Sequence, residues 1–179
     1  RGNPLYSTMI TKLCSFNPRT EFILSVLQDV LRENDEQQIM LLSHNKNLLT
    51  YIYKAITSRD IAGCSVGYYV GGMKEKDLQE TETKDVILGT FSMASEGFDC
   101  KYPLDTIFLM SPKSNIEQAV GRILRQEAKD RKFIPLVIDI SDTFSVFGAQ
   151  AKKRIQFYEK NKYCHITNYC HLMRWEPRQ

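Results

Sequence analysis

One stretch in the second half of the chain combines residue types and a spacing that suit anion chemistry. Ser114 and Glu117 have the spacing of a capping box, which predicts a helix that begins near Asn115. Four residues then share one face of that helix, at i, i+3, i+4 and i+7: Gln118, Gly121, Arg122 and Arg125. The arginine fork matches phosphate oxygens, and a glycine lets a ligand approach closely. The face therefore predicts anion binding, and the alternative is a surface helix with two solvated arginines.

A second group of candidates follows the apolar residues 86–88. Thr90 comes two residues after this run, and Gly97 and Asp99 lie a few residues further on. Hydroxyl, carboxylate and backbone N–H groups at the mouth of a sheet can bind a ligand. The alternative is a strand-to-helix turn with a threonine cap and a glycine turn.

Two other loops also follow apolar runs. Ser43, His44 and Asn45 come after residues 39–42, and Gly71 and Gly72 come after residues 65–70. Ser43 suits a helix N-cap, and a histidine here is more often a local hydrogen-bonding group than a catalyst. The two glycines are also typical of a simple turn.

These residues need a framework of alternating elements. Apolar runs predict strands over residues 39–42, 65–70, 86–88, 105–110 and 134–140. Helical patterns cover residues 21–31, 46–56 and 146–158, and a polar helix is predicted from about residue 74. Strands that are apolar throughout, with helices between them, predict an α/β fold with a mainly parallel sheet covered on both faces. Such sheets bind ligands beyond the carboxyl ends of their strands, where the candidate residues lie.

Composition limits the class of protein. The chain has 179 residues with 42% apolar and 25% charged side chains, as expected for one globular domain without a membrane partner. Its five scattered cysteines fit reduced intracellular thiols better than a disulfide framework. The net charge is +3, and residues 113–179 hold 13 basic and 7 acidic side chains, so a polyanion is expected on that half. The first residues, without an initiator Met, read as a piece of a longer protein.

The motifs together resemble the second RecA-like lobe of a superfamily 2 helicase. The string QAVGRILR (118–125) resembles motif VI and LGTFSMASEGFD (88–99) resembles motif V, while SHNKN (43–47) and YVGGM (69–73) resemble motifs IV and IVa. They occur in the family's order, over residues 38–158. With the string RIQFY (154–158), they look closest to helicases of phages and large cytoplasmic DNA viruses, of the poxvirus or African swine fever virus type and related to the excision-repair branch.

The resemblance implies a RecA-like three-layer sandwich and a division of roles. Arg125 matches the arginine finger, Arg122 the second arginine that contacts phosphate, and Gln118 a further catalytic position. The positions that the resemblance places at the nucleotide are Gly97, Asp99 and Gly121. Those that it places along the nucleic-acid backbone are Ser43, His44, Asn45, Gly71, Gly72 and Thr90.

The implied domain plan has three parts. Residues 1–35 form an N-terminal segment and first helix packed on the lobe, residues 36–162 the RecA-like lobe, and residues 163–179 a tail. The tail contains the pairs Cys164-His165 and Cys170-His171, but adjacent ligands rarely converge on one tetrahedral ion, so no metal site is expected. Tyr163, Tyr169 and Trp175 could stack on bases, and packing is the expected role.

The resemblance implies an ATP-dependent DNA or RNA helicase or translocase, inside the host cell or virion. The sequence has no Gly-x-x-x-x-Gly-Lys-Ser/Thr loop for ATP. Residues 35–38, Asp-Glu-Gln-Gln, precede a strand and so lie at the wrong end of the sheet for Mg²⁺. ATP and Mg²⁺ are therefore expected to need a first lobe of the same polypeptide, and this chain alone should be inactive. The rivals are a non-catalytic RecA-like binding module and a Rossmann-like enzyme, which the missing Gly-x-Gly-x-x-Gly disfavours.

Overall fold

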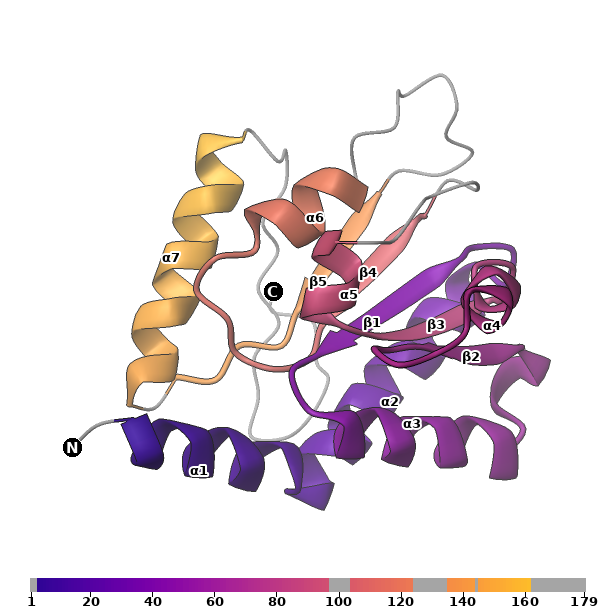
Figure 1. Ribbon diagram of the computed structural model, residues 1–179, viewed down its shortest axis with the longest axis horizontal. Coiled ribbons are helices and arrows are strands. Elements are labelled where there is room, and N and C mark those ends of the chain that lie inside the picture. Colours follow the sequence, from indigo (N-terminus) through magenta and orange to yellow (C-terminus); the bar gives the residue numbers. More distant parts are fainter. Residues whose placement is uncertain (1–2, 97–103, 124–134, 144, 162–179) are drawn as a thin grey trace.

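A sheet of parallel strands forms the centre of the computed structural model (Figure 1), which describes residues 3–96, 104–123, 135–143 and 145–161. The strands of this part lie in the order β2-β3-β1-β4-β5, and all neighbours are parallel. Their bounds are β1 Ile39–Ser43, β2 Val66–Tyr69, β3 Val86–Thr90, β4 Thr106–Leu109 and β5 Leu136–Asp139. Each lies within one residue or two of a predicted strand, so the predicted α/β fold with a parallel sheet is confirmed.

The helices agree with the sequence pattern with two exceptions. The described elements are α1 Asn3–Cys14, α2 Asn17–Glu33, α3 Lys46–Ser58, the short 3₁₀ turn η1 Ile61–Gly63, α4 Glu75–Thr81, α5 Phe91–Glu96, α6 Glu117–Ile123 and α7 Val146–Lys160. The sequence pattern did not indicate α1 or α5. Among the side chains of α1 that the structure describes, the buried apolar ones, Leu13 and Cys14, lie in the last turn. Helix α5 has six residues, too few to show a helical period.

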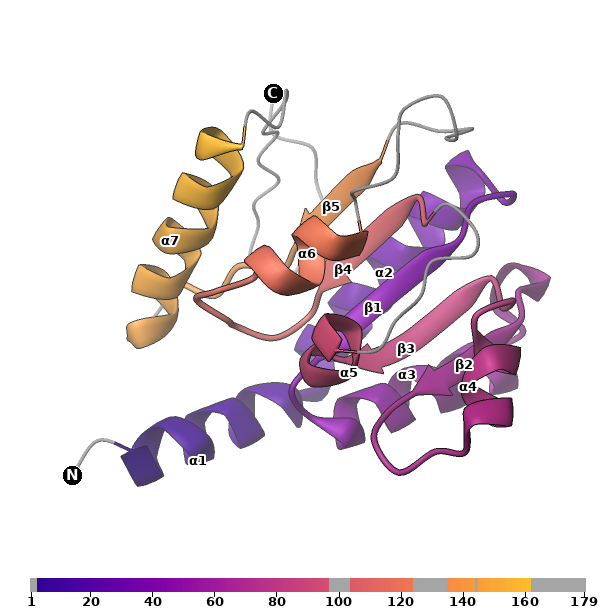
Figure 2. The ribbon, with the colours of Figure 1, turned by 45° about the horizontal axis from the view of Figure 1, so that its top comes forward.

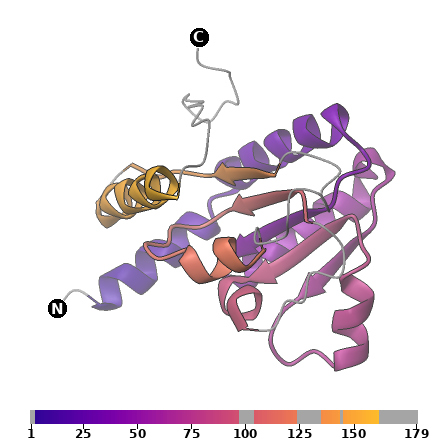
Figure 3. The ribbon, with the colours of Figure 1, turned by 90° about the horizontal axis from the view of Figure 1, so that it is seen from above.

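Alternate residues of the central strands serve two separate cores. In β1, Ile39 and Leu41 pack in the core formed with α2 and α3. Met40 and Leu42 point to the opposite face and pack with residues of α4, α5 and α6. All four are fully buried because β1 is covered on both faces. Figure 3 shows the resulting three layers, with α2 and α3 on one side of the sheet and α4, α5 and α6 on the other.

The strand register brings the carboxyl ends together. Ser43 at the end of β1 pairs with Thr90 at the end of β3, and Leu109 of β4 pairs with Asp139 of β5. The loops that carry the candidate residues consequently start from one edge of the sheet. Across the described residues, none of the helices has the length and apolar character that spanning a membrane requires.

The opposite, amino-terminal edge holds the polar run that resembled a carboxylate box. Gln37 accepts a hydrogen bond from Thr106 Oγ1 at 2.6 Å and donates to the Val30 carbonyl at 2.9 Å. Gln38 donates to the carbonyls of Glu82 and Lys84 at 2.7 and 2.9 Å. These amides lie at the edge of the sheet away from the candidate site. This is the edge that the position of residues 35–38 before β1 predicted.

Helix α7 lies beyond β5 (Figure 2). An ion pair between Arg154 and Asp139 joins the two elements. Arg154 is 1% exposed, and its side chain donates to both carboxylate oxygens of Asp139, at 2.8 and 3.0 Å. Its third donor, Nη1, bonds to the Lys113 carbonyl at 2.9 Å. Tyr158 donates to the same carboxylate at 2.8 Å. One guanidinium thus joins α7, the end of β5 and the loop before α6.

A second buried arginine repeats this arrangement from the other layer. Arg19 of α2 is 4% exposed and donates to both oxygens of Asp142, at 3.0 and 2.8 Å. Its Nη2 also donates to the Met110 carbonyl at 2.7 Å. Both arginines therefore bind an aspartate that ends or follows β5, and both bind a carbonyl of residues 110–113.

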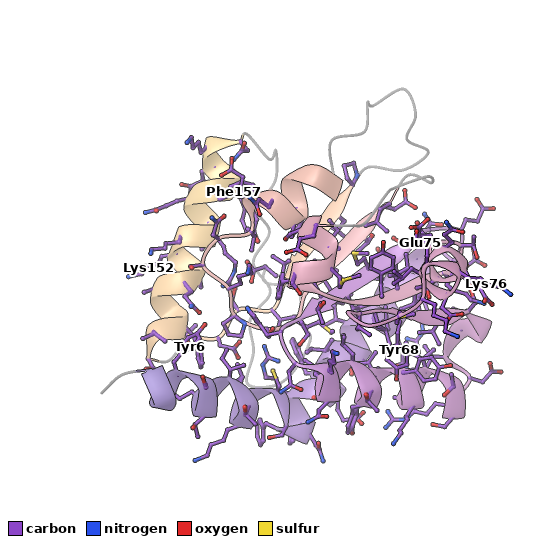
Figure 4. The ribbon with its side chains drawn as sticks, in the orientation of Figure 1. Tyr6, Tyr68, Glu75, Lys76, Lys152 and Phe157 are labelled. Carbon is purple, nitrogen blue, oxygen red and sulfur yellow. The ribbon has the colours of Figure 1, made fainter. Side chains whose placement is uncertain are left out.

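Helix α1 contacts the start of α7. The Tyr6 hydroxyl accepts a hydrogen bond from Gln150 at 2.9 Å, and its ring centroid lies 6.1 Å from that of Phe147. Figure 4 shows Tyr6 between the two helices. The N-terminal segment thereby packs on the part of the chain that follows β5.

We predict that Arg154→Ala lowers the free energy of unfolding by about 3–5 kcal/mol, because it leaves the carboxylate of Asp139, whose side chain is only 15% exposed, without its charge partner. Urea denaturation of the purified protein measures this change. The matched control is Arg32→Ala, which removes an exposed pair with Asp29 at 3.7 Å and should cost less than about 1 kcal/mol. Equal losses in the two variants would contradict the role assigned to Arg154.

Candidate functional site

An open pocket of about 540 Å³ lies at the carboxyl edge of the sheet. It is lined by His44, Lys46, Gly71, Thr90, Phe91, Ser92, Ser95, Glu96, Lys113 and Gln118. Four candidates from four separate sequence motifs are therefore brought to one place: His44, Gly71, Thr90 and Gln118. The other lining residues were not among the candidates.

The loop after β1 is closed by its own side chains. Ser43 is fully buried, and its hydroxyl accepts from the Asn45 backbone N–H at 3.0 Å. Asn45, and not Ser43, is the N-cap of α3: its Oδ1 accepts from the N–H groups of Asn47 and Leu48 at 2.8 and 3.3 Å. The N-cap therefore lies two residues after the expected Ser43, because Ser43 is still part of β1. Ser43 and the Asn45 oxygen therefore shape the loop from inside.

His44 is the exposed member of this loop. Its backbone N–H donates to Ser111 Oγ at 3.0 Å, and its Nδ1 lies 2.8 Å from the same oxygen. The ring centroid lies 4.7 Å from that of Phe91. Loss of hydration beside these groups, and secondarily the charge of Lys113, lowers the pKa of His44 to about 4. The imidazole is consequently neutral at pH 7, and one ring nitrogen is a hydrogen-bond donor.

The glycine pair and Thr90 have a role in the local backbone structure, and Gly71 and Thr90 also line the pocket. Gly72 has φ = 85°, a conformation that favours glycine, so this pair does form a turn. A Cβ added to Gly71 would meet no atom within 4 Å, which leaves the backbone open toward the pocket. The Thr90 hydroxyl lies 3.4 Å from the Met93 N–H and 3.3 Å from Ser92 Oγ. Thr90 therefore bonds to the first turn of α5 while it lines the pocket.

The helix with the glutamine and the arginines starts slightly later than predicted. Glu117 is the first residue of α6, and Asn115 Oδ1 accepts from its N–H at 3.2 Å. The first turn is thus bound by Asn115 and not by a Ser114 capping box. Gln118 is exposed at the pocket, and a Cβ at Gly121 would find open space. This face of α6 is consequently accessible to a ligand.

Part of the expected nucleotide set is not described. Arg122 lies on α6, but its side chain is outside the described part of the structure. Gly97, Asp99 and Arg125 lie outside the described residues altogether, as does the tail from residue 162 onward. Their roles remain those that the resemblance implies.

Two lysines that were not among the predicted site residues add positive charge to the pocket. Lys46 is exposed in the first turn of α3, and Lys113 extends over the Phe91 ring with its Nζ 5.3 Å from the centroid. The Glu96 carboxylate lines the same pocket. Lys46 directly follows the candidates 43–45, so the sequence held a signal for it. Lys113 had none, because its place depends on the path of the chain after β4.

The parallel sheet, the two helical layers and the polar residues at the carboxyl edge define a RecA-like α/β domain. No family model matches the sequence. A protein of Acanthamoeba polyphaga mimivirus that is named as an ATP-dependent RNA helicase is 37% identical over 163 residues, which cover 90% of this chain and 30% of the relative. An African swine fever virus protein with the same type of name is 28% identical over 73% of this chain and 26% of its own length. The chain thus spans about a third or less of these curated relatives.

Solved structures agree on the fold. T4 UvsW has a TM-score of 0.67 and 18% identity over 90% of this chain and 36% of its own. The C-terminal part of the Fun30 ATPase domain has a TM-score of 0.56 and 13% identity over 72% of this chain and 43% of its own. The RecA-like fold is confirmed by these neighbours. The mimivirus relative shows that the chain belongs to the family of viral proteins named as ATP-dependent RNA helicases, which confirms the resemblance to helicases that the four motifs indicated.

We predict that His44 makes stability depend on pH. Its folded-state pKa of about 4 lies below the ordinary histidine value of 6.5, so the unfolded chain binds the proton more readily. The contribution is complete above about pH 6.5 and is lost as the pH falls toward about 4. Urea unfolding from pH 7 to pH 4 should show a smaller loss in His44→Gln than in the wild type. Parallel curves for the two proteins would refute the shift.

Proposed function

We propose that this chain is the second motor lobe of an ATP-dependent nucleic-acid helicase or translocase. In this proposal, the pocket binds the phosphodiester backbone and α6 faces ATP held by a separate first lobe of the parent polypeptide. The observation that carries the proposal is the convergence of His44, Gly71, Thr90 and Gln118 on one open pocket, together with two lysines. Homology to viral proteins named as ATP-dependent RNA helicases supports it.

Backbone binding fits the chemistry of the pocket wall. Lys46 and Lys113 supply positive charge, and neutral His44 and the Thr90 hydroxyl supply hydrogen-bonding groups. Phosphate contacts of this kind hold a strand without reading its sequence. Gly71 leaves room for the strand because nothing occupies the space where its side chain would be. Within the proposal, Ser43, Asn45 and Gly72 act by fixing the loop shapes.

The residues of α6 also fit a triphosphate. Gln118 is exposed and Gly121 leaves open space on the same face, so an anionic ligand can come close to the helix. We assign Arg122 and Arg125 to the γ-phosphate, and Gly97 and Asp99 to the nucleotide. ATP with Mg²⁺ supplies the phosphoryl transfer whose free energy drives movement along the strand.

The proposed motion follows because this lobe carries both the nucleic-acid site and the residues assigned to the nucleotide. The motif V segment, from Thr90 to Asp99, runs from the nucleic-acid pocket to the assigned nucleotide residues. Binding of the γ-phosphate by Arg122 and Arg125 would draw this lobe toward the first, and release after hydrolysis would let them part. Because Thr90 and His44 hold the strand to this lobe, each cycle moves the strand relative to the other lobe.

The arginine finger gives the first prediction for function. Arg125→Ala in the full-length parent should reduce nucleic-acid-stimulated ATP hydrolysis by about a thousandfold or more, because the charge that stabilises phosphoryl transfer is lost. The assay should compare single-stranded DNA, duplex DNA and RNA as stimulants. Arg32→Ala, with an exposed arginine on α2, is the control and should keep wild-type turnover. Normal hydrolysis by Arg125→Ala would leave the non-catalytic binding module as the better reading.

The two lysines give a separate prediction for binding. Lys46→Ala and Lys113→Ala should each weaken binding of a labelled single strand to a similar degree for different sequences, and each should lower the salt dependence by about one phosphate contact. Fluorescence anisotropy at several salt concentrations measures both. Lys54→Ala is the matched control, because Lys54 is exposed on the same helix as Lys46 but does not line the pocket. An unchanged salt slope in the pocket variants would count against this binding site.

A further inference from the structure

Ser111, which lies outside all the helicase motifs, contacts the exposed histidine of the pocket. It follows β4 by two residues and is 2% exposed. Its hydroxyl oxygen lies 3.0 Å from the backbone nitrogen of His44 and 2.8 Å from the ring Nδ1. One buried hydroxyl thus contacts both the main chain and the side chain of a residue 67 positions away.

The two contacts together favour one set of proton positions. The His44 N–H can only donate, so Ser111 Oγ accepts from it. Oγ has a second lone pair and could also accept from an Nδ1–H, but the buried hydroxyl hydrogen would then have no acceptor among the described residues. Donation from the hydroxyl to Nδ1 satisfies both groups. A neutral imidazole that accepts at Nδ1 carries its proton on Nε2. Nε2–H is thereby the hydrogen-bond donor of a residue that lines the pocket.

Residues on both sides of Ser111 are fixed by the buried arginines. Arg19 binds the Met110 carbonyl at 2.7 Å, and Arg154 binds the Lys113 carbonyl at 2.9 Å. The Met110 N–H also donates to the Leu42 carbonyl of β1 at 2.9 Å. The serine hydroxyl is consequently held in a defined place relative to the end of β1. The Phe91 ring, 4.7 Å from the imidazole, packs against His44 as well.

We propose that Ser111 is a positioning residue for nucleic-acid binding, which holds His44 in the Nε2-protonated form so that Nε2–H donates to an oxygen of the phosphodiester backbone. This proposal rests on the proposed function of the pocket. Ser111 itself does not touch the strand, because its side chain is buried behind His44. Its effect should therefore pass through His44 and change strand binding rather than the chemical step.

A double-mutant cycle in the full-length parent tests this path. Ser111→Ala should raise both the Kd for a fluorescein-labelled single strand and the strand concentration for half-maximal ATPase stimulation about fivefold, with kcat unchanged. His44→Ala should have at least that effect, and the double variant should be no weaker than His44→Ala alone. Ser111→Cys, which keeps a similar volume with a weaker hydrogen-bonding group, should fall between Ser111→Ala and the wild type. Ser25→Ala is the control, because Ser25 is an exposed serine of α2 whose hydroxyl donates to the Glu21 carbonyl.

A spectroscopic measurement tests the pair independently of activity. In the full-length protein labelled with ¹⁵N-histidine, with the His44 signals assigned through His44→Ala, the wild type should show the Nε2-protonated form at pH 7. Ser111→Ala should show a mixture of the two neutral forms, and Ser111→Cys serves if the alanine variant does not fold.

The outcomes separate this proposal from the function on which it rests. Additive losses in the cycle, a fall in kcat at unchanged strand affinity, or an Nδ1-protonated His44 in the wild type would overturn the role of Ser111. A parent protein that binds no strand would overturn the proposed function and this role, while the histidine spectrum would still report whether the pair exists. A wild-type Nε2–H signal that Ser111→Ala converts to a mixture, with a non-additive cycle, supports both.

Discussion

Two buried arginine–aspartate pairs hold the parts of this domain on which the candidate site depends. Arg19 reaches Asp142 from α2, and Arg154 reaches Asp139 from α7, so the helices bind the end of β5 from two sides. Each guanidinium has a further donor bound to a carbonyl between residues 110 and 113. Burying an arginine is costly unless its charge is paired, and both guanidinium groups are paired here, although Arg19 Nη1 has no hydrogen-bond partner among the described residues. Four ionic groups therefore fix the path of residues 110–113, which lead into α6: Arg19, Asp142, Arg154 and Asp139. None of the four lines the pocket.

Much of the fold followed from simple patterns. The five strands were visible as apolar runs because a parallel sheet with two covered faces needs apolar side chains on both sides of each strand. Helix α2 was visible from its apolar stripe. Helix α5 was not, since six residues hold too few turns for a period, and α1 buries apolar side chains mainly at its end. The helix caps were predicted less well, because serine and asparagine can both cap a helix. At the start of α3 and of α6, the asparagine side chain accepts the backbone hydrogen bond.

Site residues that belong to a sequence motif could be predicted. Residues that depend on a partner distant in the sequence could not. His44, Gly71, Thr90 and Gln118 were found because each follows a strand or lies on a helix face with the right spacing. Ser111 was missed because its partner is 67 residues away and a single buried serine has no pattern of its own. Arg19 and Arg154 were missed because an arginine in a helix is usually solvated. The pairing of such residues depends on which loops meet, and that is decided only when the sheet has formed.

The buried pairs also bear on how fast a strand could bind. A loop fixed during folding has already lost its conformational freedom, so the strand need not wait for it to order. Association at the pocket would then be limited by diffusion and by attraction to the exposed lysine, with weak dependence on local rearrangement. Changes to His44 or Ser111 would appear mainly in how long a strand stays bound. A preformed site of this kind suits a translocase that must bind and release a nucleic-acid strand many times, because the site has the same shape at every binding event.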